Sequence, residues 1–320
     1  MALLYDARGN IYAVVSPDSL RRQGIDVPHL AADAARSKDT WAQAAIAAEC
    51  EWSTVPRPSG AKAHRCDGLL VGPFQDRAPF DLLIVNTDGT LAERSGNGLT
   101  IFAQALTDQG LMNQACDLRV HHDKTDAISP VLTRVEPEQY EQAQGFWLTL
   151  GCPAFGALAV GATGPENHVA QLAALNPAWD YSQFVRVGNP HCVTLVQQAS
   201  ALPDFQQLHA AALFEPLQAI AFAPPAGAGL PCSAGVNLQW AAHEGGQRVL
   251  ARVFERGEGP TASSGTSASA VACAAWRAGW VTDGVVAVVM PGGTAPVRLQ
   301  AQAEELPSIS LFGVARLQGQ

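Results

Sequence analysis

The chain has 320 residues, 48% of them hydrophobic and 15% charged, so it can bury a large core and is long enough for two domains. Its formal charge of -9 argues against a nucleic-acid groove or an anionic membrane surface, because both partners require a basic face. No apolar run approaches the roughly 20 residues of a membrane span, which argues against an integral membrane protein.

The compartment is indicated by the first residues and by the cysteines. Residues 1–6 (Met-Ala-Leu-Leu-Tyr-Asp) have no basic region ahead of their apolar residues, which is not typical of a targeting signal. The seven cysteines are odd in number and lack Cys-x-x-Cys spacing, so we expect reduced core residues. They are Cys50, Cys66, Cys116, Cys152, Cys192, Cys232 and Cys273. These features predict a cytoplasmic protein.

Most of the chain consists of short β-rich runs, which Gly, Pro and Asn turn signals separate. Predicted strands include residues 11–15, 82–85, 146–150 and 192–196. Predicted helices are few, at residues 40–48, 99–106, 200–211 and 268–278. Because strands and helices do not alternate regularly, a doubly wound parallel sheet is disfavoured. The pattern predicts an α+β fold of two sheet-rich domains, each a mostly antiparallel sheet or barrel wrapped around a central helix.

Two Ser-Gly pairs indicate that the two domains are diverged copies of one unit. Ser95-Gly96 precedes the first of the two matching helices, and Ser264-Gly265 precedes the second, 169 positions later. A helix N-terminus attracts negative charge, so two of them could hold a carboxylate and the carbanion derived from it. Ser95 and Ser264 are therefore the primary candidate site residues.

Three further motifs each have an ordinary interpretation as a turn or a surface ion pair. These motifs are Asn86-Thr-Asp-Gly89 followed by Ser95-Gly-Asn-Gly98, Gly188-Asn-Pro-His191, and Glu255-Arg-Gly257. Gly9-Asn10, Asp67-Gly68, Val236-Asn237, Gly265-Thr266, Pro291-Gly-Gly293 and Phe312-Gly313 complete an ordered series along the chain. In that order the series resembles the diaminopimelate epimerase family, the cofactor-independent amino-acid epimerases related to proline racemase.

The resemblance implies a fold of two pseudo-symmetric halves with the site in the cleft between them. In the family an α-proton is removed from an amino acid by one thiolate and returned by a thiol on the opposite face, without pyridoxal phosphate. We therefore expect no cofactor and no metal, and a small amino acid or dicarboxylate as substrate. The C-terminal tail is expected to return to the first half. The expected domains are therefore residues 1–132 together with 305–320, and residues 133–304. Family members are often dimers, so a homodimer is possible.

The resemblance also implies roles for individual residues. The catalytic positions are Ser95 and Ser264, and the expected contacts to the α-amino and α-carboxylate groups are Asn10, Gly96, Asn97, Glu255, Gly265 and Thr266. The expected contacts to the polar far end of the substrate are Asn86, Asn189, Asn237 and Arg256. A planar guanidinium suits a distal carboxylate, since it can donate two parallel hydrogen bonds.

The chain departs from the family at both catalytic positions, where the epimerases have cysteines. A helix N-terminus can convert a thiol to a thiolate, whereas a hydroxyl is a far weaker acid and needs an adjacent base. Next to the two serines in sequence, only Glu93 and Arg94 are charged. The two-thiol mechanism therefore cannot run unchanged.

Three interpretations of the serines stay open. They are a Cys-to-Ser variant made to trap substrate, a natural enzyme with different chemistry such as dehydration or allylic isomerisation, and a non-catalytic amino-acid-binding protein. Thr100, Pro260 and Ser267 also depart from the usual family residues, which favours natural divergence over a deliberate exchange.

Other chemistries have little support. There is no Gly-x-Ser-x-Gly elbow for an esterase and no His-Glu-x-x-His spacing for a metal. The run His121-His122-Asp123 is more typical of a polar loop than of a ligand set, and His191 is expected to brace its turn. The sequence predicts a cofactor-independent racemase or epimerase-like isomerase.

Overall fold

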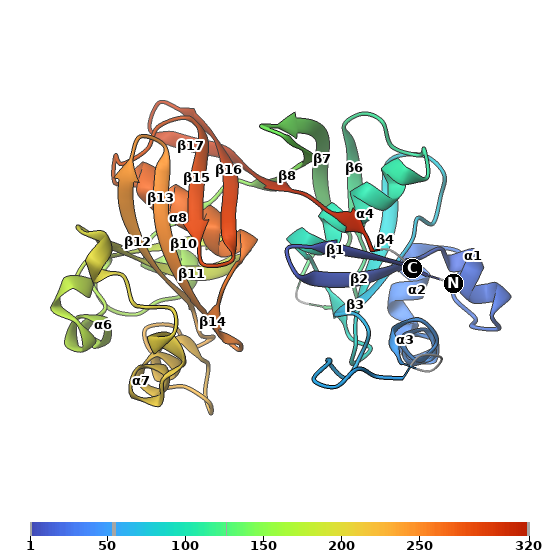
Figure 1. The fold of residues 1–320 in the computed structure, drawn as a ribbon, viewed down its shortest axis with the longest axis horizontal. Helices are drawn as coiled ribbons and strands as arrows, with labels where there is room; N and C mark the ends of the chain where they lie inside the picture. The colour runs from blue at the N-terminus through green and yellow to red at the C-terminus, as the bar shows by residue number, and fades with distance from the viewer. Residues whose placement is uncertain (1, 53–55, 126, 319–320) are drawn as a thin grey trace. The chain divides into compact units, whose positions relative to one another are not determined.

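The computed structural model describes residues 2–52, 56–125 and 127–318, and the chain divides into two compact units (Figure 1). Unit 1 comprises Met1–Leu148 and Gly313–Gln320, and unit 2 comprises Thr149–Phe312. The change of unit falls later than the expected residue 133. The physical reason is that β7 (Val131–Tyr140) and β8 (Ala143–Gly151) form one antiparallel hairpin that pairs through β6 with the rest of unit 1. What was expected of residues 1, 319 and 320 lies outside the described residues.

Unit 1 is a mostly antiparallel sheet with one helix on its inner face and three short helices on the other. Its remaining strands are β1 (Leu3–Ala7), β2 (Asn10–Val15), β3 (Gly68–Val71), β4 (Phe80–Asn86), β5 (Leu91–Ala92), β6 (Cys116–Val120) and β18 (Arg316–Leu317). Its helices are α1 (Pro17–Arg22), α2 (Ala31–Arg36), α3 (Ala42–Cys50) and α4 (Gly96–Asp108), with a 3-10 turn at Lys38–Thr40. Alternate strand residues pack into two apolar clusters, one around α4 and one beneath α1 to α3.

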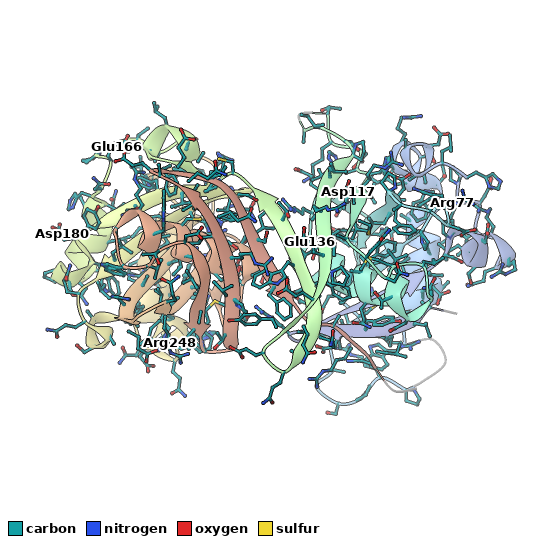
Figure 2. All side chains as sticks on the ribbon, turned by 90° about the horizontal axis from the view of Figure 1, so that it is seen from above. Arg77, Asp117, Glu136, Glu166, Asp180 and Arg248 are labelled. Carbon is teal, nitrogen blue, oxygen red and sulfur yellow. The ribbon has the colours of Figure 1, made fainter. Side chains whose placement is uncertain are left out.

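Unit 2 repeats this plan. Its strands are β9 (Ala154–Phe155), β10 (Ser182–Val187), β11 (Asn189–Val196), β12 (Asn237–Gly245), β13 (Arg248–Glu255), β14 (Gly259–Thr261), β15 (Gly284–Met290), β16 (Gly293–Gln302) and β17 (Glu305–Gly313). Its helices are α5 (Ala157–Val160), α6 (Ala170–Leu175), α7 (Ala211–Ala221) and α8 (Gly265–Arg277). Charged side chains such as Glu166, Asp180 and Arg248 lie on its exposed surface (Figure 2).

The two units pair their strands in the same order, which indicates that they are copies of one unit. The first hairpin is antiparallel in both, β1–β2 and β10–β11, and the next pairing is parallel in both, β2–β3 and β11–β12. The antiparallel pairs β3–β4 and β12–β13 follow, and then the parallel pairs β4–β6 and β13–β15. A short strand closes each unit against its first strand, β18 on β1 and β9 on β10. This repetition confirms the predicted α+β fold of two pseudo-symmetric halves.

Each sheet wraps one central helix, as predicted. In α8 the nine residues from Ser267 to Ala275 are all buried, so the helix is apolar or small on every side. A helix of that composition is stable only when strands surround it, and small side chains let those strands approach closely. In α4, Leu99, Phe102 and Leu106 are fully buried against the first sheet.

The predicted strands at 11–15, 82–85, 146–150 and 192–196 are confirmed within β2, β4, β8 and β11. The helix predicted at 200–211 is wrong. Asp204 accepts hydrogen bonds from the N–H groups of Gln206 and Gln207, which builds a turn there, and the helix α7 begins only at Ala211.

All seven cysteines are free thiols, and six of them are buried. Cys152 is exposed, so its predicted place in the core is wrong. It lies between β8 and β9, next to Pro153, where the chain has left the sheet. Within the described part of the chain, no helix is both long and apolar enough to cross a membrane.

Candidate active site

Ser95 is the N-cap of α4, and its extended backbone (φ -143°, ψ 118°) turns the chain into the helix. Its Oγ accepts a hydrogen bond of 3.0 Å from the N–H of Gly98. The hydroxyl of Tyr12 lies 3.4 Å from the same oxygen. The first half-site is therefore a serine hydroxyl held at a positive helix end, with a phenol beside it.

Ser264 is the N-cap of α8 with nearly the same backbone (φ -142°, ψ 125°). Its Oγ accepts a longer contact of 3.4 Å from the N–H of Ser267 and donates a hydrogen bond of 2.7 Å to Glu255 Oε1. The other carboxylate oxygen accepts a hydrogen bond of 3.1 Å from Thr261 Oγ1. In the second half-site the serine hydroxyl is thus paired with a carboxylate.

The pKa of Glu255 is raised because burial disfavours the charged carboxylate, and this effect outweighs the opposing hydrogen bonds from Ser264 and Thr261. A half-buried carboxyl with a raised pKa beside a hydroxyl is an arrangement suited to accepting a proton. The sequence showed no base next to Ser264. The fold supplies one from the end of β13, nine positions earlier in the chain.

The two helix starts match in detail beyond the serines. Thr100 Oγ1 donates 2.9 Å to the carbonyl of Gly96, and Ser269 Oγ donates 2.9 Å to the carbonyl of Gly265. Both helices have 13 residues, and the residue after each has the same backbone angles (φ -81°, ψ -3°). The first-turn N–H groups at Gly96, Asn97, Gly265 and Thr266 therefore belong to two equivalent anion-attracting ends.

In unit 1 the structure brings together two of the predicted binding residues. Asn97 Nδ2 donates a hydrogen bond of 2.5 Å to Asn10 Oδ1. Asp67 holds the strand that carries Asn10, because its Oδ2 accepts from the N–H of Ile11 at 2.9 Å. Asn10, Asn97 and Ser95 form one cluster around the start of α4.

In unit 2 three predicted residues also meet. Arg256 Nη2 donates 3.2 Å to Asn189 Oδ1, and Asn237 Oδ1 accepts 2.9 Å from the backbone N–H of Arg256. Arg256 Nη1 also donates 3.0 Å to the carbonyl of Ala234, so the guanidinium is oriented from two sides. It follows Glu255 directly at the end of β13.

Asn86 ends β4, and its side chain braces its own turn. The Nδ2 group donates 2.9 Å to Thr90 Oγ1, and the backbone N–H donates 2.8 Å to the carbonyl of Thr90. No described contact joins it to Ser95, so its expected role at the substrate remains a prediction.

Three of the histidines, His121, His122 and His191, make contacts within their own unit. His191 is fully buried, Nδ1 lies 3.0 Å from Gln239 Nε2, and burial lowers its pKa to about 3. His121 lies 2.9 Å from Asp81, and His122 lies 3.0 Å from the carbonyl of Ile128. Within residues 2–52, 56–125 and 127–318, no three His, Cys, Asp or Glu side chains group as metal ligands do.

The charged neighbours of Ser95 in sequence do not supply a base. The Glu93 carboxylate lies 2.8 Å from Lys124 Nζ. Burial lowers the pKa of Arg94 to about 10, so this side chain remains a cation at neutral pH. Sequence reasoning missed the contact of Tyr12 with Ser95 and gave Thr261, next to Glu255, no role. For Tyr12 a signal was present, since residues 10 and 12 of one strand point to the same face.

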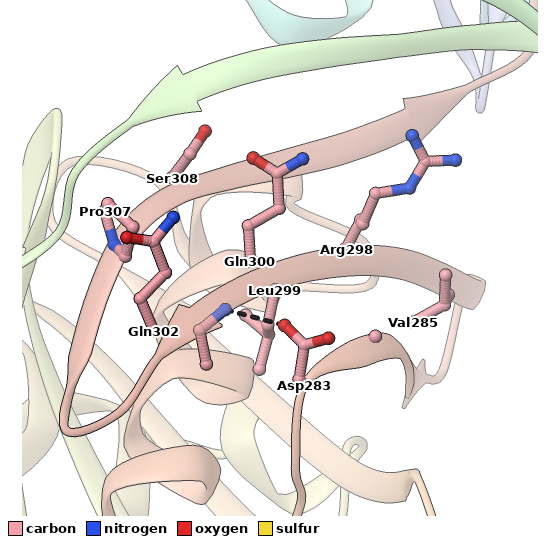
Figure 3. Close-up of a pocket in the computed structure, with 10 residues that line it drawn as sticks. Asp283, Val285, Arg298, Leu299, Gln300, Gln302, Pro307 and Ser308 are labelled. Atoms are coloured by element: carbon pink, nitrogen blue, oxygen red, sulfur yellow. Dashed lines mark hydrogen bonds between the residues drawn. The ribbon is translucent and has the colours of Figure 1, made fainter.

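Two surface pockets contain none of the predicted site residues. One of about 600 Å³ lies over β15 to β17, where Asp283, Arg298, Gln300 and Ser308 line it (Figure 3). The other, of about 360 Å³, lies in unit 1 between His29, Phe74 and Arg119. The chemistry of the two half-sites lies elsewhere.

Sequence comparison finds relatives of this chain among the diaminopimelate epimerases. The sequence profile of the family described as diaminopimelate epimerase matches residues 183–317. A diaminopimelate epimerase of Nostoc is 28% identical over 237 residues, covering 73% of this chain and 74% of the relative. A diaminopimelate epimerase of Burkholderia thailandensis is 28% identical, covering 77% of this chain and 79% of the relative. One from Streptomyces coelicolor is 30% identical, covering 65% and 62%.

Solved structures share the fold at low identity. A methylitaconate-delta-isomerase superposes with a TM-score of 0.57 at 12% identity, covering 99% of this chain and 93% of the other. A hydroxyproline epimerase from Agrobacterium vitis, with bound trans-4-hydroxy-L-proline, superposes with a TM-score of 0.52 at 15% identity. The match covers 99% of this chain and 89% of the other. A phenazine biosynthesis protein of the PhzF family from Bacillus anthracis superposes with a TM-score of 0.54 at 13% identity. The match covers 99% of this chain and 96% of the other.

The fold and these relatives define the class of the protein as an isomerase of the racemase and epimerase kind. Within that class the chain is a relative of the diaminopimelate epimerases, as the ordered motifs predicted.

Proposed function

We propose that the protein moves a proton at an acidic C–H of a small amino acid or carboxylate that has a second polar end, with diaminopimelate as the leading candidate. One observation carries this proposal: Ser264, at the start of α8, donates a 2.7 Å hydrogen bond to the half-buried Glu255 carboxylate. This pair restores a proton acceptor to a site that lacks the thiol of its relatives. We further propose that Ser95 and Ser264 act on the same substrate carbon.

The proposed proton removal runs through both members of the pair. Ser264 Oγ takes the substrate proton while its own hydrogen passes to Glu255 Oε1, so the step leaves a carbanion and a neutral carboxylic acid. The raised pKa of Glu255 supports this step, because a stronger carboxylate base holds the proton better. Ser95 Oγ–H supplies a proton to the other face of the carbon.

The negative charge of the intermediate is supported by the two helix starts. A carbanion next to a carboxylate spreads its charge onto the carboxylate oxygens, and backbone N–H groups at a helix N-terminus are fixed donors for such oxygens. Gly265 and Thr266 provide these groups in unit 2, and Gly96 and Asn97 provide them in unit 1.

The far end of the substrate is proposed to lie at Arg256. Its guanidinium is oriented by Asn189 and by the carbonyl of Ala234, which favours a planar partner such as a carboxylate. Arg256 follows Glu255 at the end of β13, and the proposal assigns to the two side chains oppositely charged groups of one substrate. A substrate with a single polar end would leave the guanidinium without its ligand.

The test is solvent exchange. The full chain is incubated in D2O with LL- and meso-diaminopimelate, and in separate reactions with L- and D-proline, and deuterium at the α-carbon is followed by NMR. Exchange together with interconversion of the diaminopimelate isomers is expected. Glu244→Gln, a change at an exposed carboxylate of the same unit that pairs with Arg248, is the control and should exchange as the wild type does.

Three outcomes would contradict the proposal. Release of an unsaturated or keto acid would identify a dehydratase. A shift of a double bond in an unsaturated dicarboxylate, without exchange of any amino acid, would identify an allylic isomerase. Measurable binding of diaminopimelate without exchange would identify a binding protein.

A further inference from the structure

The two serines differ in how their hydroxyl hydrogens are used. A serine hydroxyl has one hydrogen to donate and two lone pairs to accept with. Ser264 donates its hydrogen to Glu255 and accepts one contact from the N–H of Ser267. One lone pair is left over, so Ser264 faces a ligand as an acceptor.

Ser95 uses its hydrogen-bonding groups in the opposite way. Its Oγ accepts from the N–H of Gly98 at 3.0 Å, and the Tyr12 hydroxyl lies 3.4 Å away. A phenol is the stronger acid and an aliphatic hydroxyl the better acceptor, so the phenol is the natural donor of this pair. Both lone pairs of Ser95 are then used, and its hydrogen is left for a ligand.

The position of the Tyr12 ring depends on a glycine in the neighbouring strand. Tyr12 pairs with Gly68 between β2 and β3, and a Cβ at Gly68 would lie 2.9 Å from Tyr12 Cε1 and 3.3 Å from Cδ1. Only a residue without a side chain leaves room for the ring on that path. In unit 2 the equivalent pair is His191 and Asn237, so the phenolic hydroxyl at this position belongs to unit 1 alone.

We infer that Tyr12 is a positioning residue that donates to Ser95 and makes Ser95 the proton-delivering side of the reaction, opposite in sense to Ser264. This inference rests on the proposed function. When Ser95 gives its proton to the carbanion, Tyr12 gives its phenolic proton to Ser95 Oγ, and the resulting phenolate regains a proton from water. In the reverse direction each of these transfers runs backwards.

The first test needs no substrate. The difference in phenolate absorbance between the wild type and Tyr12→Phe isolates Tyr12 from the other tyrosines as pH is raised. A hydrogen bond from the phenol to Ser95 stabilises the protonated phenol, so Ser95→Ala is expected to lower the midpoint of this titration. A higher midpoint would mean that Ser95 is the donor, and an unchanged midpoint would mean no coupling. Either result would overturn the inference whether or not the protein is an isomerase.

The second test uses the two diaminopimelate isomers separately, each deuterated at the α-carbon and followed in ordinary water. Tyr12→Phe keeps the ring over Gly68 and removes only the hydroxyl. Loss of deuterium is expected to slow by at least about tenfold for the isomer whose hydrogen leaves through Ser95, and by less than about twofold for the other. A merely structural role would slow both isomers alike, and that outcome would overturn the inference.

The matched control is Tyr5→Phe. Tyr5 is fully buried in the same unit, and its hydroxyl donates 2.9 Å to Asp108, the last residue of α4, at the end of the helix remote from Ser95. This variant also removes one phenol, and it should leave both exchange rates unchanged. Thermal unfolding of the two variants shows that each is folded before the rates are compared.

Discussion

Asn86 ends β4 in the first half of the molecule at the position where Glu255 ends β13 in the second. The amide of Asn86 donates to Thr90 in its own turn, whereas the carboxylate of Glu255 accepts from Ser264 at the helix start. Two copies of one unit have thus kept the same backbone and taken side chains of different charge. Among the described residues, Ser264 has a carboxylate partner and Ser95 does not.

Replacing Glu255 with Gln should abolish most of the exchange at the α-carbon, by about 10²- to 10⁴-fold, because an amide cannot take the proton from Ser264. In the wild type the exchange rate should rise with pH through the raised pKa of Glu255, since only the carboxylate form accepts. The residual rate of the variant should lack this rise. A variant with an unchanged pH profile would show that the base is another group.

The titration of Glu255 should also change the free energy of unfolding. Burial raises the pKa of Glu255 above its ordinary value of 4.5, so the folded state binds the proton more tightly than the unfolded chain does. The free energy of unfolding contributed by this group is therefore fully present below pH 4.5 and falls as pH rises through the raised pKa. Urea unfolding at a series of pH values should show the wild type losing stability relative to Glu255→Gln. Parallel curves would refute this.

Ser95→Ala and Ser264→Ala should each lower the free energy of unfolding by about 0.5–2 kcal/mol, because each removes an N-cap acceptor. Ser264→Ala also removes the 2.7 Å hydrogen bond to the Glu255 carboxylate, so the larger effect is expected there. Ser200→Ala serves as the control, since Ser200 is exposed and caps no α-helix. A loss above about 4 kcal/mol in either variant would indicate a role in the core beyond capping.

The double change Ser95→Cys with Ser264→Cys should accelerate deuterium exchange into diaminopimelate by at least about tenfold. A thiol at a helix N-terminus reaches the thiolate far more readily than a hydroxyl reaches the alkoxide, with pKa values of roughly 3.5 to 7.5. The single variants are the controls and should each fall between the wild type and the double variant. Exchange no faster than that of the wild type would mean that the surrounding groups no longer fit this substrate.

Arg256→Lys should raise the KM for diaminopimelate by about tenfold, equivalent to about 1.4 kcal/mol, and leave kcat within a factor of a few. An ammonium cannot reproduce the planar pair of donors that Asn189 and Ala234 orient. Arg248→Lys, at an exposed ion pair with Glu244, is the control. An unchanged KM in Arg256→Lys would place the far end of the substrate elsewhere.

The strands and the two central helices could be predicted because their signals are local. Alternating apolar residues mark the strands, and the Ser-Gly pairs mark both helix starts, which begin at Gly96 and Gly265. The helix α7 was not predicted at its true place because Pro216 lies inside it and conceals its helical pattern. The short helices α1 and α2 are too brief for their periodicity to be read.

The members of each half-site could be predicted, but their partners could not. Glu255 was expected at the α-centre of the substrate, and only the antiparallel pairing of β13 with β14 shows that it also reaches Ser264. Tyr12 looked like an ordinary strand aromatic, because its contact with Ser95 spans 83 positions. Such contacts depend on register between distant strands, which a single sequence does not display.

The matching strand order of the two units has a consequence for how an unequal pair of half-sites could arise. In a homodimer of one such unit, every substitution would appear twice. An acid on one side and a base on the other are out of reach for a protein encoded that way. Fusion of two copies into one gene lets Asn86 and Glu255 differ, so a preference for the direction of proton flow could be inherited.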